Sequence, residues 1–162
     1  MLDVAKISIK ELLGMAVRAE IDANKVYAKL TNRFSNPLLK EKFRMLAFEE
    51  NKHRQALEGL FRRKYGKEKI SIPPHADKDL LPALNLTASS PLVEILNQAM
   101  ESEKSAENFY AKLAKRAEEP DKKILEYLSK VEHSHYTMLR SEYLLAQEFD
   151  DYGEMDADRV VT

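Results

Sequence analysis

Two short motifs in the sequence place a histidine three residues after a glutamate, at Glu50-x-x-His53 and at Glu132-x-x-His135. Residues three apart in an α-helix lie on one face, about one turn from each other, so each motif offers a carboxylate and an imidazole to the same point. Oxygen ligands with one imidazole per metal suit iron or manganese, and zinc less specifically. One such motif is weak evidence in a glutamate-rich chain, but the second copy predicts a metal site.

Both motifs lie within stripes of apolar residues that have the period of a helix. Four segments show such a stripe, each with a glutamate near its middle: Leu13, Ala16, Glu20, Ala23, Tyr27 and Leu30; Phe43, Leu46, Glu50, His53, Leu57 and Leu60; Leu96, Ala99, Glu103, Ala106, Tyr110 and Leu113; Leu125, Leu128, Glu132, His135 and Leu139. Such stripes are typical of helices that face the interior of a bundle. A buried carboxylate costs several kcal/mol unless it is paired, protonated or bound to metal. Glu20 and Glu103 are therefore candidate ligands beside the two motifs.

The spacing along the first half of the chain places three of these side chains at one depth. The stretch from Glu20 to Asn36 is nearly as long as the stretch from Asn36 to Glu50 or to His53. If two antiparallel helices meet at Asn36, all three side chains lie roughly 24 Å from the turn, at about 1.5 Å per residue. They are therefore predicted to converge.

The second half of the chain repeats this arrangement around Glu119. Glu103 precedes this position by nearly the same distance along the chain as Glu132 and His135 follow it. Four carboxylates with two neutral imidazoles carry a charge of −4, which two divalent cations would cancel. One glutamate from each of two helices, with Glu-x-x-His from each of two others, is the ligand set of di-iron and di-manganese bundles. The alternative is a solvated helix face with ordinary charges.

Helix start signals precede all four stripes. Ser8 with Glu11 forms a capping-box pattern, Asn36-Pro37 and Ser90-Pro91 each supply an N-cap and a first-turn proline, and Pro120 opens the last helix. The helices are predicted at residues 8–34, 37–66, 91–118 and 120–150. The predicted fold class is all-α, an antiparallel four-helix bundle.

An internal repeat organises the chain. Tyr-Ala-Lys-Leu occurs at 27–30 and again at 110–113, two helical turns after Glu20 and Glu103 respectively. The segment between the two halves holds three prolines and shows no sustained period, which predicts a long connection. The predicted organisation is a single domain, 1–162, with helical hairpins 8–66 and 90–150, a crossover connection 67–89 and an acidic, frayed tail 151–162.

Composition excludes several classes of protein. Cysteine is absent, which rules out disulfides, thiolate-bound zinc and iron–sulfur clusters in this chain. The net charge of −1 provides no basic field for nucleic acid. No apolar run reaches the roughly 18 residues of a membrane span, and the N-terminal segment lacks the apolar core of a secretory signal. A cytoplasmic protein with no nucleic-acid or membrane partner is expected.

The motifs Glu20-x6-Tyr27, Glu50-x-x-His53, Glu103-x6-Tyr110 and Glu132-x-x-His135 resemble those of the ferritin-like superfamily, and most closely the di-iron domain of rubrerythrins. The resemblance covers the chain from Ser8 to Asp150. It implies a ferritin-like bundle whose second and third helices are parallel, and two metal ions, most often iron. The ligands that it implies are Glu20, Glu50, His53, Glu103, Glu132 and His135. Of these, Glu50 and Glu132 are the bridging candidates.

The resemblance also implies an activity. Rubrerythrins and their relatives reduce hydrogen peroxide or oxidise ferrous iron with dioxygen, and many form dimers or larger assemblies. The chain departs from the family in two respects. The rubredoxin domain with its cysteine pairs is missing, so electrons must come from a separate, rubredoxin-like protein. The extra glutamate that rubrerythrins place three residues after the third-helix ligand is replaced by Ala106, with Glu107 one position further as a possible additional ligand or a surface carboxylate.

The long connection fits a site formed within one chain. A second helix spanning residues 37–65 is roughly 44 Å long at about 1.5 Å per residue. The connection 67–89 reaches at most about 76 Å when extended at about 3.3 Å per residue, so it can cross the bundle. The same reach allows the second hairpin to pair with a neighbouring subunit, but this slack removes any strain that would favour such a swap.

Several other side chains have alternative interpretations. Tyr27 and Tyr110 lie two turns from Glu20 and Glu103, where their hydroxyls either bond the ligand carboxylates, transfer an electron or simply pack in the core. Three further residues are interpreted as lying outside the ligand set. Glu49 points away from the inward stripe, either to the surface or to a ligand. His133 is interpreted as a surface histidine, and His75 lies in the connection.

Three functions follow from these observations. The leading hypothesis is an oxidoreductase, a di-iron peroxidase or ferroxidase. The second is iron binding and storage, which requires a closed shell of subunits. The third is a structural di-metal site, with manganese or zinc as other candidate metals, in a protein that acts through interaction.

Overall fold

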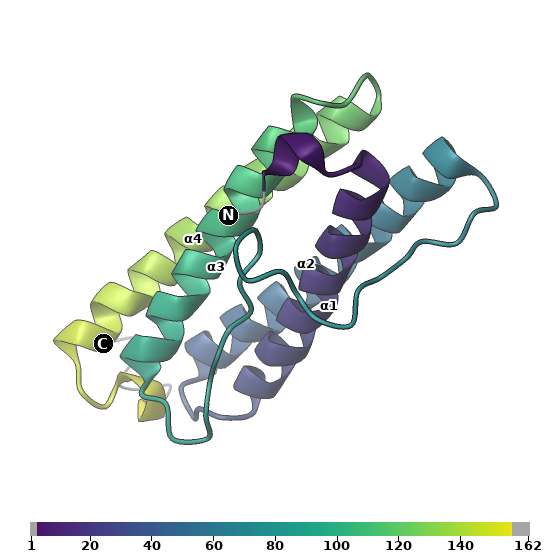
Figure 1. Ribbon diagram of the computed structural model, residues 1–162. Coiled ribbons are helices and arrows are strands. Elements are labelled where there is room, and N and C mark those ends of the chain that lie inside the picture. Colours follow the sequence, from purple (N-terminus) through teal and green to yellow (C-terminus); the bar gives the residue numbers. More distant parts are fainter. Residues whose placement is uncertain (1–2, 157–162) are drawn as a thin grey trace.

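The structure is a computed structural model that describes residues 3–156, and its architecture is a bundle of four long helices (Figure 1). These are α1 (Ile9–Thr31), α2 (Pro37–Tyr65), α3 (Leu92–Ala114) and α4 (Asp121–Glu148), with short 3-10 helices at Val4–Lys6 and Tyr152–Glu154. No strand occurs among the described residues, and the predicted all-α class is confirmed. Within residues 3–156, no helix combines the length and the apolar character that crossing a membrane demands.

Local sequence explains how the first two helices begin. The Ser8 side chain accepts a hydrogen bond from the Glu11 backbone N–H, and the Glu11 side chain bonds back to the Ser8 backbone, as the capping-box pattern predicts. The side chain of Asn36 accepts from the backbone N–H groups of Leu38 and Leu39. Gly66, with φ of 64°, ends α2 in the left-handed region that glycine tolerates.

The later helices differ from the prediction at their ends. Ser90 does not cap α3, because its hydroxyl accepts from the Thr87 backbone N–H instead, and Pro91 is the N-cap residue. The third helix stops at Ala114, short of the predicted end at residue 118, and α4 stops at Glu148. Segment 115–119 is mostly charged, so it offers few apolar side chains to hold a further helical turn against the bundle.

Each half of the chain forms one antiparallel hairpin, α1 with α2 and α3 with α4, and α2 also contacts α4. The connection between the hairpins runs back along the α1 and α3 face, so that α2 and α3 are parallel (Figure 1). Gly14 allows this close approach, since a Cβ atom there would collide with the Ser71 carbonyl oxygen. Further along, Leu81 is buried and the Ser102 hydroxyl donates to the Pro82 carbonyl.

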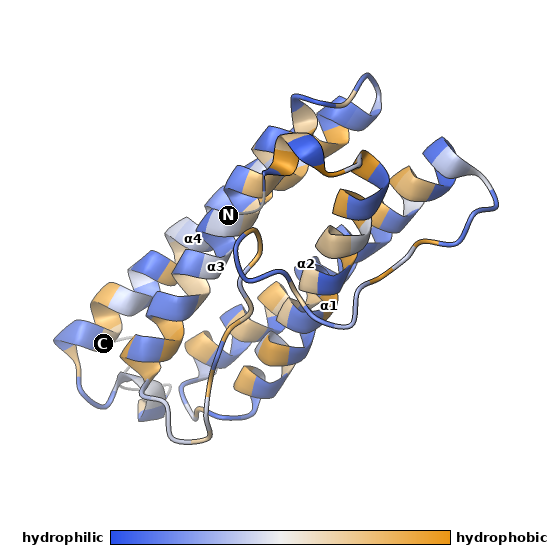
Figure 2. Ribbon diagram, viewed as in Figure 1, coloured by the Kyte–Doolittle hydropathy of each residue, from blue (hydrophilic) through white to orange (hydrophobic). Residues whose placement is uncertain are grey.

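The apolar core is divided into two clusters, each built from all four helices. One cluster includes Leu13, Leu57, Leu113 and Leu125, and the other includes Leu30, Phe43, Leu96 and Leu139. The inward faces of the helices are accordingly the hydrophobic ones (Figure 2). Between the clusters lies a layer of buried glutamate and histidine side chains.

The C-terminal segment packs against the bundle, so the expectation of a frayed tail is wrong for its first part. Tyr152 is buried, and its hydroxyl donates to the buried Glu142 at 2.6 Å. The Gly153 carbonyl accepts from the Ser35 and Asn36 backbone N–H groups, at 3.1 and 3.0 Å. This segment therefore covers the turn between α1 and α2. The rest of the predicted tail, 157–162, lies outside the described residues.

Candidate metal centre

The buried polar layer contains all six side chains that the sequence predicts as metal ligands. Every helix contributes to it: Glu20 from α1, Glu50 and His53 from α2, Glu103 from α3, and Glu132 and His135 from α4. Each of these residues is at most 4% exposed. The helical period explains the convergence, because it places every one of them on the inward face at the same depth.

These side chains form two overlapping groups. The first group consists of Glu20, Glu50, His53 and Glu132, and the second consists of Glu50, Glu103, Glu132 and His135. Within each group, the potential ligand atoms lie within 4.8 Å of one another. Glu50 and Glu132 belong to both groups, which is the arrangement expected of carboxylates that bridge two ions.

The Nδ1 atoms of the two histidines face the carboxylates. His53 Nδ1 lies 2.9 Å from Glu132 Oε1 and 3.2 Å from Glu50 Oε2. His135 Nδ1 lies 3.3 Å from Glu50 Oε1 and 3.3 Å from Glu132 Oε2. The imidazole rings are stacked, with centroids 5.5 Å apart and planes inclined by 16°. One nitrogen ligand is thus available to each group.

Several of these buried atoms make no hydrogen bond despite their proximity. They are Glu50 Oε1, His53 Nδ1, both carboxylate oxygens of Glu132 and His135 Nδ1. Buried polar atoms without partners are rare in folded proteins and call for an explanation. Two metal ions satisfy all of them at once, since oxygen and imidazole donors are suitable ligands for iron, manganese and zinc. The residues present therefore fit a di-metal centre.

Two tyrosines join the hairpins next to this layer. The Tyr27 hydroxyl on α1 donates to Glu103 Oε1 on α3, and the Tyr110 hydroxyl on α3 donates to Glu20 Oε1 on α1. Both tyrosines are fully buried, and burial together with the neighbouring carboxylates raises their pKa well above 10. They therefore remain hydrogen-bond donors at any physiological pH and fix the orientation of two candidate ligands.

A further carboxylate reaches the far side of one histidine. Glu49 Oε2 on α2 lies 2.5 Å from His135 Nε2 on α4. The Glu49 side chain is 38% exposed, whereas that of His135 is 3% exposed. The sequence left open whether Glu49 faces the surface or a ligand, and its place on α2 lets it do both.

Burial and mutual charge give the metal-free layer a defined protonation. Burial raises the pKa of Glu20 and Glu103 well above 4.5, and the charges of Glu50 and Glu132 raise it further. Burial also tends to raise the pKa of Glu50 and Glu132. The imidazoles of His53 and His135 have the larger, opposite effect, so the pKa of both carboxyl groups is lowered.

The imidazoles respond in the complementary way. Burial lowers the pKa of His53 and His135, but the carboxylates around each ring outweigh it and raise the pKa well above 6.5. In the absence of metal, these directions favour the protonated form of Glu20, Glu103 and both imidazoles and the ionised form of Glu50 and Glu132. This combination keeps the net charge of the six side chains small, which lowers the cost of burying them together.

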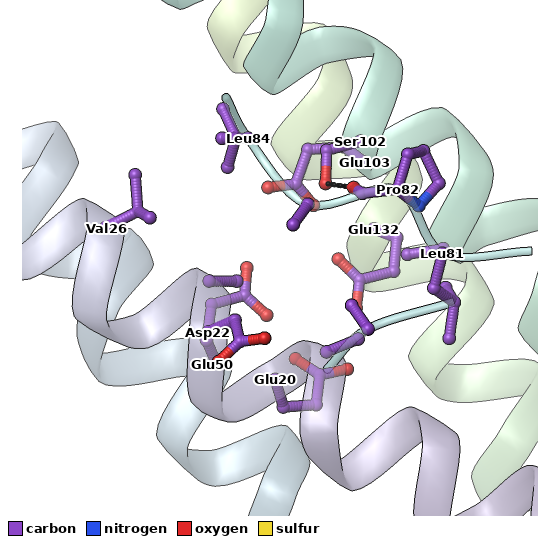
Figure 3. Close-up of a pocket in the computed structure, with 15 residues that line it drawn as sticks. Glu20, Asp22, Val26, Glu50, Leu81, Pro82, Leu84, Ser102, Glu103 and Glu132 are labelled. Atoms are coloured by element: carbon purple, nitrogen blue, oxygen red, sulfur yellow. Dashed lines mark hydrogen bonds between the residues drawn. The ribbon is translucent and has the colours of Figure 1, made fainter. Parts of the chain in front are cut away.

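A cavity of about 40 Å³ reaches the layer from the α1 and α3 face (Figure 3). The carboxylates of Glu20, Glu50, Glu103 and Glu132 line its inner side. The rest of the lining consists of alanines at 19, 23 and 106, the crossover residues Ala76 and Leu81–Leu84, and the side chains of Asp22, Val26 and Ser102. At roughly 10–15 Å³ per water molecule, a cavity of about 40 Å³ has room for about three waters.

Other sequence candidates lie outside the two groups. Glu107 accepts from Lys104 at 3.0 Å and lies 3.3 Å from His133 Nδ1. The His133 side chain is 57% exposed, as expected for a surface residue. His75 lines a separate hollow formed mainly by the crossover. Sequence reasoning missed the buried Glu142, which bonds Lys42 and Tyr152, although it continues the inward stripe of α4 three residues after Leu139.

The comparisons with known proteins agree with this geometry. Among solved structures, a hypothetical protein from Pyrococcus furiosus is 33% identical, with 95% of this chain and 97% of that chain covered and a TM-score of 0.80. Two others share the fold at lower identity. The first is CopM in its Cu(I)-bound form, which is 14% identical, with 86% of this chain and 97% of that chain covered and a TM-score of 0.67. The second is a dodecameric thioferritin, the bacterioferritin-related protein from Bacteroides fragilis, which is 23% identical, with 91% of this chain and 89% of that chain covered and a TM-score of 0.65.

No curated protein matches the chain. The family model for rubrerythrin, by contrast, matches residues 11–143, which include most of both hairpins and all six buried candidate ligands. The match spans most of the sequence, and the fold is the ferritin-like bundle that the motifs predict. The chain belongs to the rubrerythrin family.

Proposed function

We propose that this protein is a di-iron oxidoreductase that reduces hydrogen peroxide or oxidises ferrous iron with dioxygen. The observation that supports this most directly is the pair of overlapping ligand groups, with their unpartnered buried atoms. Glu20 and His53 would hold one metal ion, Glu103 and His135 the other, and Glu50 and Glu132 both. Two ferrous ions held there would supply the two electrons that reduce the O–O bond of hydrogen peroxide, and would become ferric.

The protein's own residues position the reaction. The tyrosine hydroxyls hold Glu20 and Glu103, the carboxylates that border the cavity, in fixed orientations beside it. The two apolar clusters pack on either side of the layer, which leaves the cavity as its described opening. Burial raises the pKa of Glu20 and Glu103, so each holds a proton near the cavity when no metal is bound.

The size of the cavity supports a small oxidant. A volume of about 40 Å³ accommodates hydrogen peroxide or dioxygen, each of which is similar in size to one or two of the roughly three waters that fit there. Its outer lining is mostly alanine, leucine and proline, and the carboxylate of Asp22, which also lines it, is paired with Arg18, so the opening suits a small uncharged molecule.

Iron sequestration is the alternative. It requires an assembly of subunits, and one protein with this fold, the thioferritin from Bacteroides fragilis, is described as dodecameric. We propose that this chain also forms a homo-oligomer. We also propose a separate, rubredoxin-like protein as the electron donor of a peroxidase cycle, because residues 1–162 contain no cysteine.

Rapid mixing of the anaerobically loaded protein with oxidants tests the proposal. Protein with two ferrous ions per chain is mixed in a stopped-flow instrument with hydrogen peroxide or, separately, with dioxygen. Faster oxidation by peroxide indicates a peroxidase, and faster oxidation by dioxygen indicates a ferroxidase. Uptake of many irons per chain into a hollow multimer would favour storage, and a metal inert to both oxidants would exclude both redox activities. Glu41→Ala, an exposed change remote from the layer, is the control.

A further inference from the structure

The internal repeat gives the centre an approximate twofold symmetry that is broken by the residue before each Glu-x-x-His motif. Glu50 corresponds to Glu132, and His53 corresponds to His135, in the two Glu-x-x-His motifs. The residue before each motif differs, because Glu49 precedes the first and Val131 precedes the second. The repeat therefore provides a carboxylate on one side of the centre and an aliphatic side chain on the other.

This difference lies in contact with a candidate ligand. Glu49 crosses from α2 to α4 and places its Oε2 atom 2.5 Å from His135 Nε2, on the side of the ring that faces away from the layer. His135 Nδ1 remains directed at the carboxylates of the second group. The His135 ring is therefore held from both sides. The repeat-related residue on α4 is Val131, whose methyl groups can neither accept nor donate a hydrogen bond, so it cannot make the corresponding contact with His53.

We propose that the two metal positions are inequivalent, that the position at His135 binds its ion first and more tightly, and that Glu49 is the positioning residue responsible. The inference rests on the proposed di-metal centre. A carboxylate that accepts the outer N–H of a ligand histidine fixes the tautomer and the ring orientation, and makes the metal-facing nitrogen more basic. The negative charge of Glu49 also lies closer to this position than to the other.

Titration of the apoprotein with Co²⁺ alone tests the inference without any turnover. Calorimetry is expected to resolve two binding steps whose affinities differ by about 10–100-fold, the range observed for second partners of ligand histidines. Crystals grown after one equivalent of Co²⁺ should show, by anomalous scattering, more metal beside His135 than beside His53. Glu49→Ala should weaken the first step by about 10–100-fold and equalise the two occupancies.

Two further variants separate the causes. Glu49→Gln keeps an oxygen acceptor for His135 but removes the charge, so it should restore part of the affinity that Glu49→Ala loses. Glu41→Ala removes an exposed α2 carboxylate whose partner is Arg44, and it should leave both steps unchanged. Circular dichroism of the apoproteins confirms that each variant folds, which is expected because Glu49 is partly exposed.

The result that overturns the inference is distinct from the failure of the proposed function. Equal occupancy of the two positions in the unaltered protein, or preferential occupancy beside His53, contradicts the inference while leaving a di-metal centre intact. Two unequal steps that persist unchanged in Glu49→Ala contradict the role of Glu49. Absence of any Co²⁺ binding removes the di-metal centre itself, and with it the proposed function.

Discussion

The Tyr27 hydroxyl on α1 bonds the Glu103 carboxylate on α3, and thereby links the first hairpin to a candidate ligand of the second. Tyr110 and Glu20 repeat the contact in the opposite direction. Each hairpin thus orients a carboxylate that belongs to the other, so the geometry of the centre depends on the docking of both halves. Neither hairpin alone contains a complete ligand group.

Tyr27→Phe should weaken the metal position of the second group, because Glu103 loses the donor that orients it. A loss of about 10-fold in affinity is expected at that position, at the lower end of the range for such partners. Tyr110→Phe should weaken the first group instead, because its partner is Glu20. Co²⁺ titration of the two variants checks this. If both variants weaken the same step, the assignment of the tyrosines to separate positions is wrong.

Glu50→Ala and Glu132→Ala should each impair binding of both ions, because each of these carboxylates belongs to both groups. Glu20→Ala should instead impair one ion, since Glu20 belongs only to the first group. Metal content per chain after loading and gel filtration is the measurement. Normal two-metal occupancy in either of the first two variants would remove the bridging assignment.

Metal loading should release about four protons for every two divalent ions, because ligands must be deprotonated to bind. The pKa of Glu20, Glu103, His53 and His135 is raised, which favours the protonated form of all four groups in the apoprotein. Calorimetric titration in buffers of different ionisation enthalpy measures the number. The buried layer would then be neutral both before and after loading. A release close to zero would show that the apoprotein carries its ligands already deprotonated.

The stability of the apoprotein should fall as pH rises from about 5.5 to 8.5. The raised pKa of Glu20 and Glu103 means that the folded state binds more protons than the unfolded state above the ordinary value of 4.5. The raised pKa of His53 and His135 has the same consequence above 6.5. Each such group contributes up to about 1.4 kcal/mol per pH unit to the loss.

The measurement is the melting temperature of the apoprotein across this pH range. The metal-loaded protein provides an internal control with the opposite sign, because protons compete with metal for the same ligands. A melting temperature of the apoprotein that is flat or rises with pH would contradict the protonation described for the layer.

The sequence predicts the six buried residues because helical periodicity fixes both direction and depth. The positions of the two turns were enough to predict that Glu20 and Glu103 lie at the same depth as the two motifs. The features that sequence reasoning missed depend on how separate elements approach one another. The Glu49–His135 contact requires the spacing of α2 and α4, and the contact between Gly14 and Ser71 requires the path of the crossover.

The ends of the helices were less predictable for a similar reason. Ser90 precedes a proline just as Asn36 does, but its hydroxyl accepts a hydrogen bond from the Thr87 backbone N–H and does not cap the helix. Tyr152 and Gly153 lie in an acidic segment that suggests fraying, but they find partners on Glu142 and on the turn at Asn36. Local pattern gives no information about partners that are distant in sequence.

The division of the core into two apolar clusters has a consequence for the life of the protein in a cell. Each cluster contains residues from all four helices, so apolar packing holds the helices together on both sides of the polar layer, whether or not the layer contains metal. Folding therefore need not wait for a scarce ion. The metal-free chain is therefore expected to keep the helix packing that the clusters provide. The same separation frees the ligands to mutate, so one scaffold can acquire a new metal preference without first losing its shape.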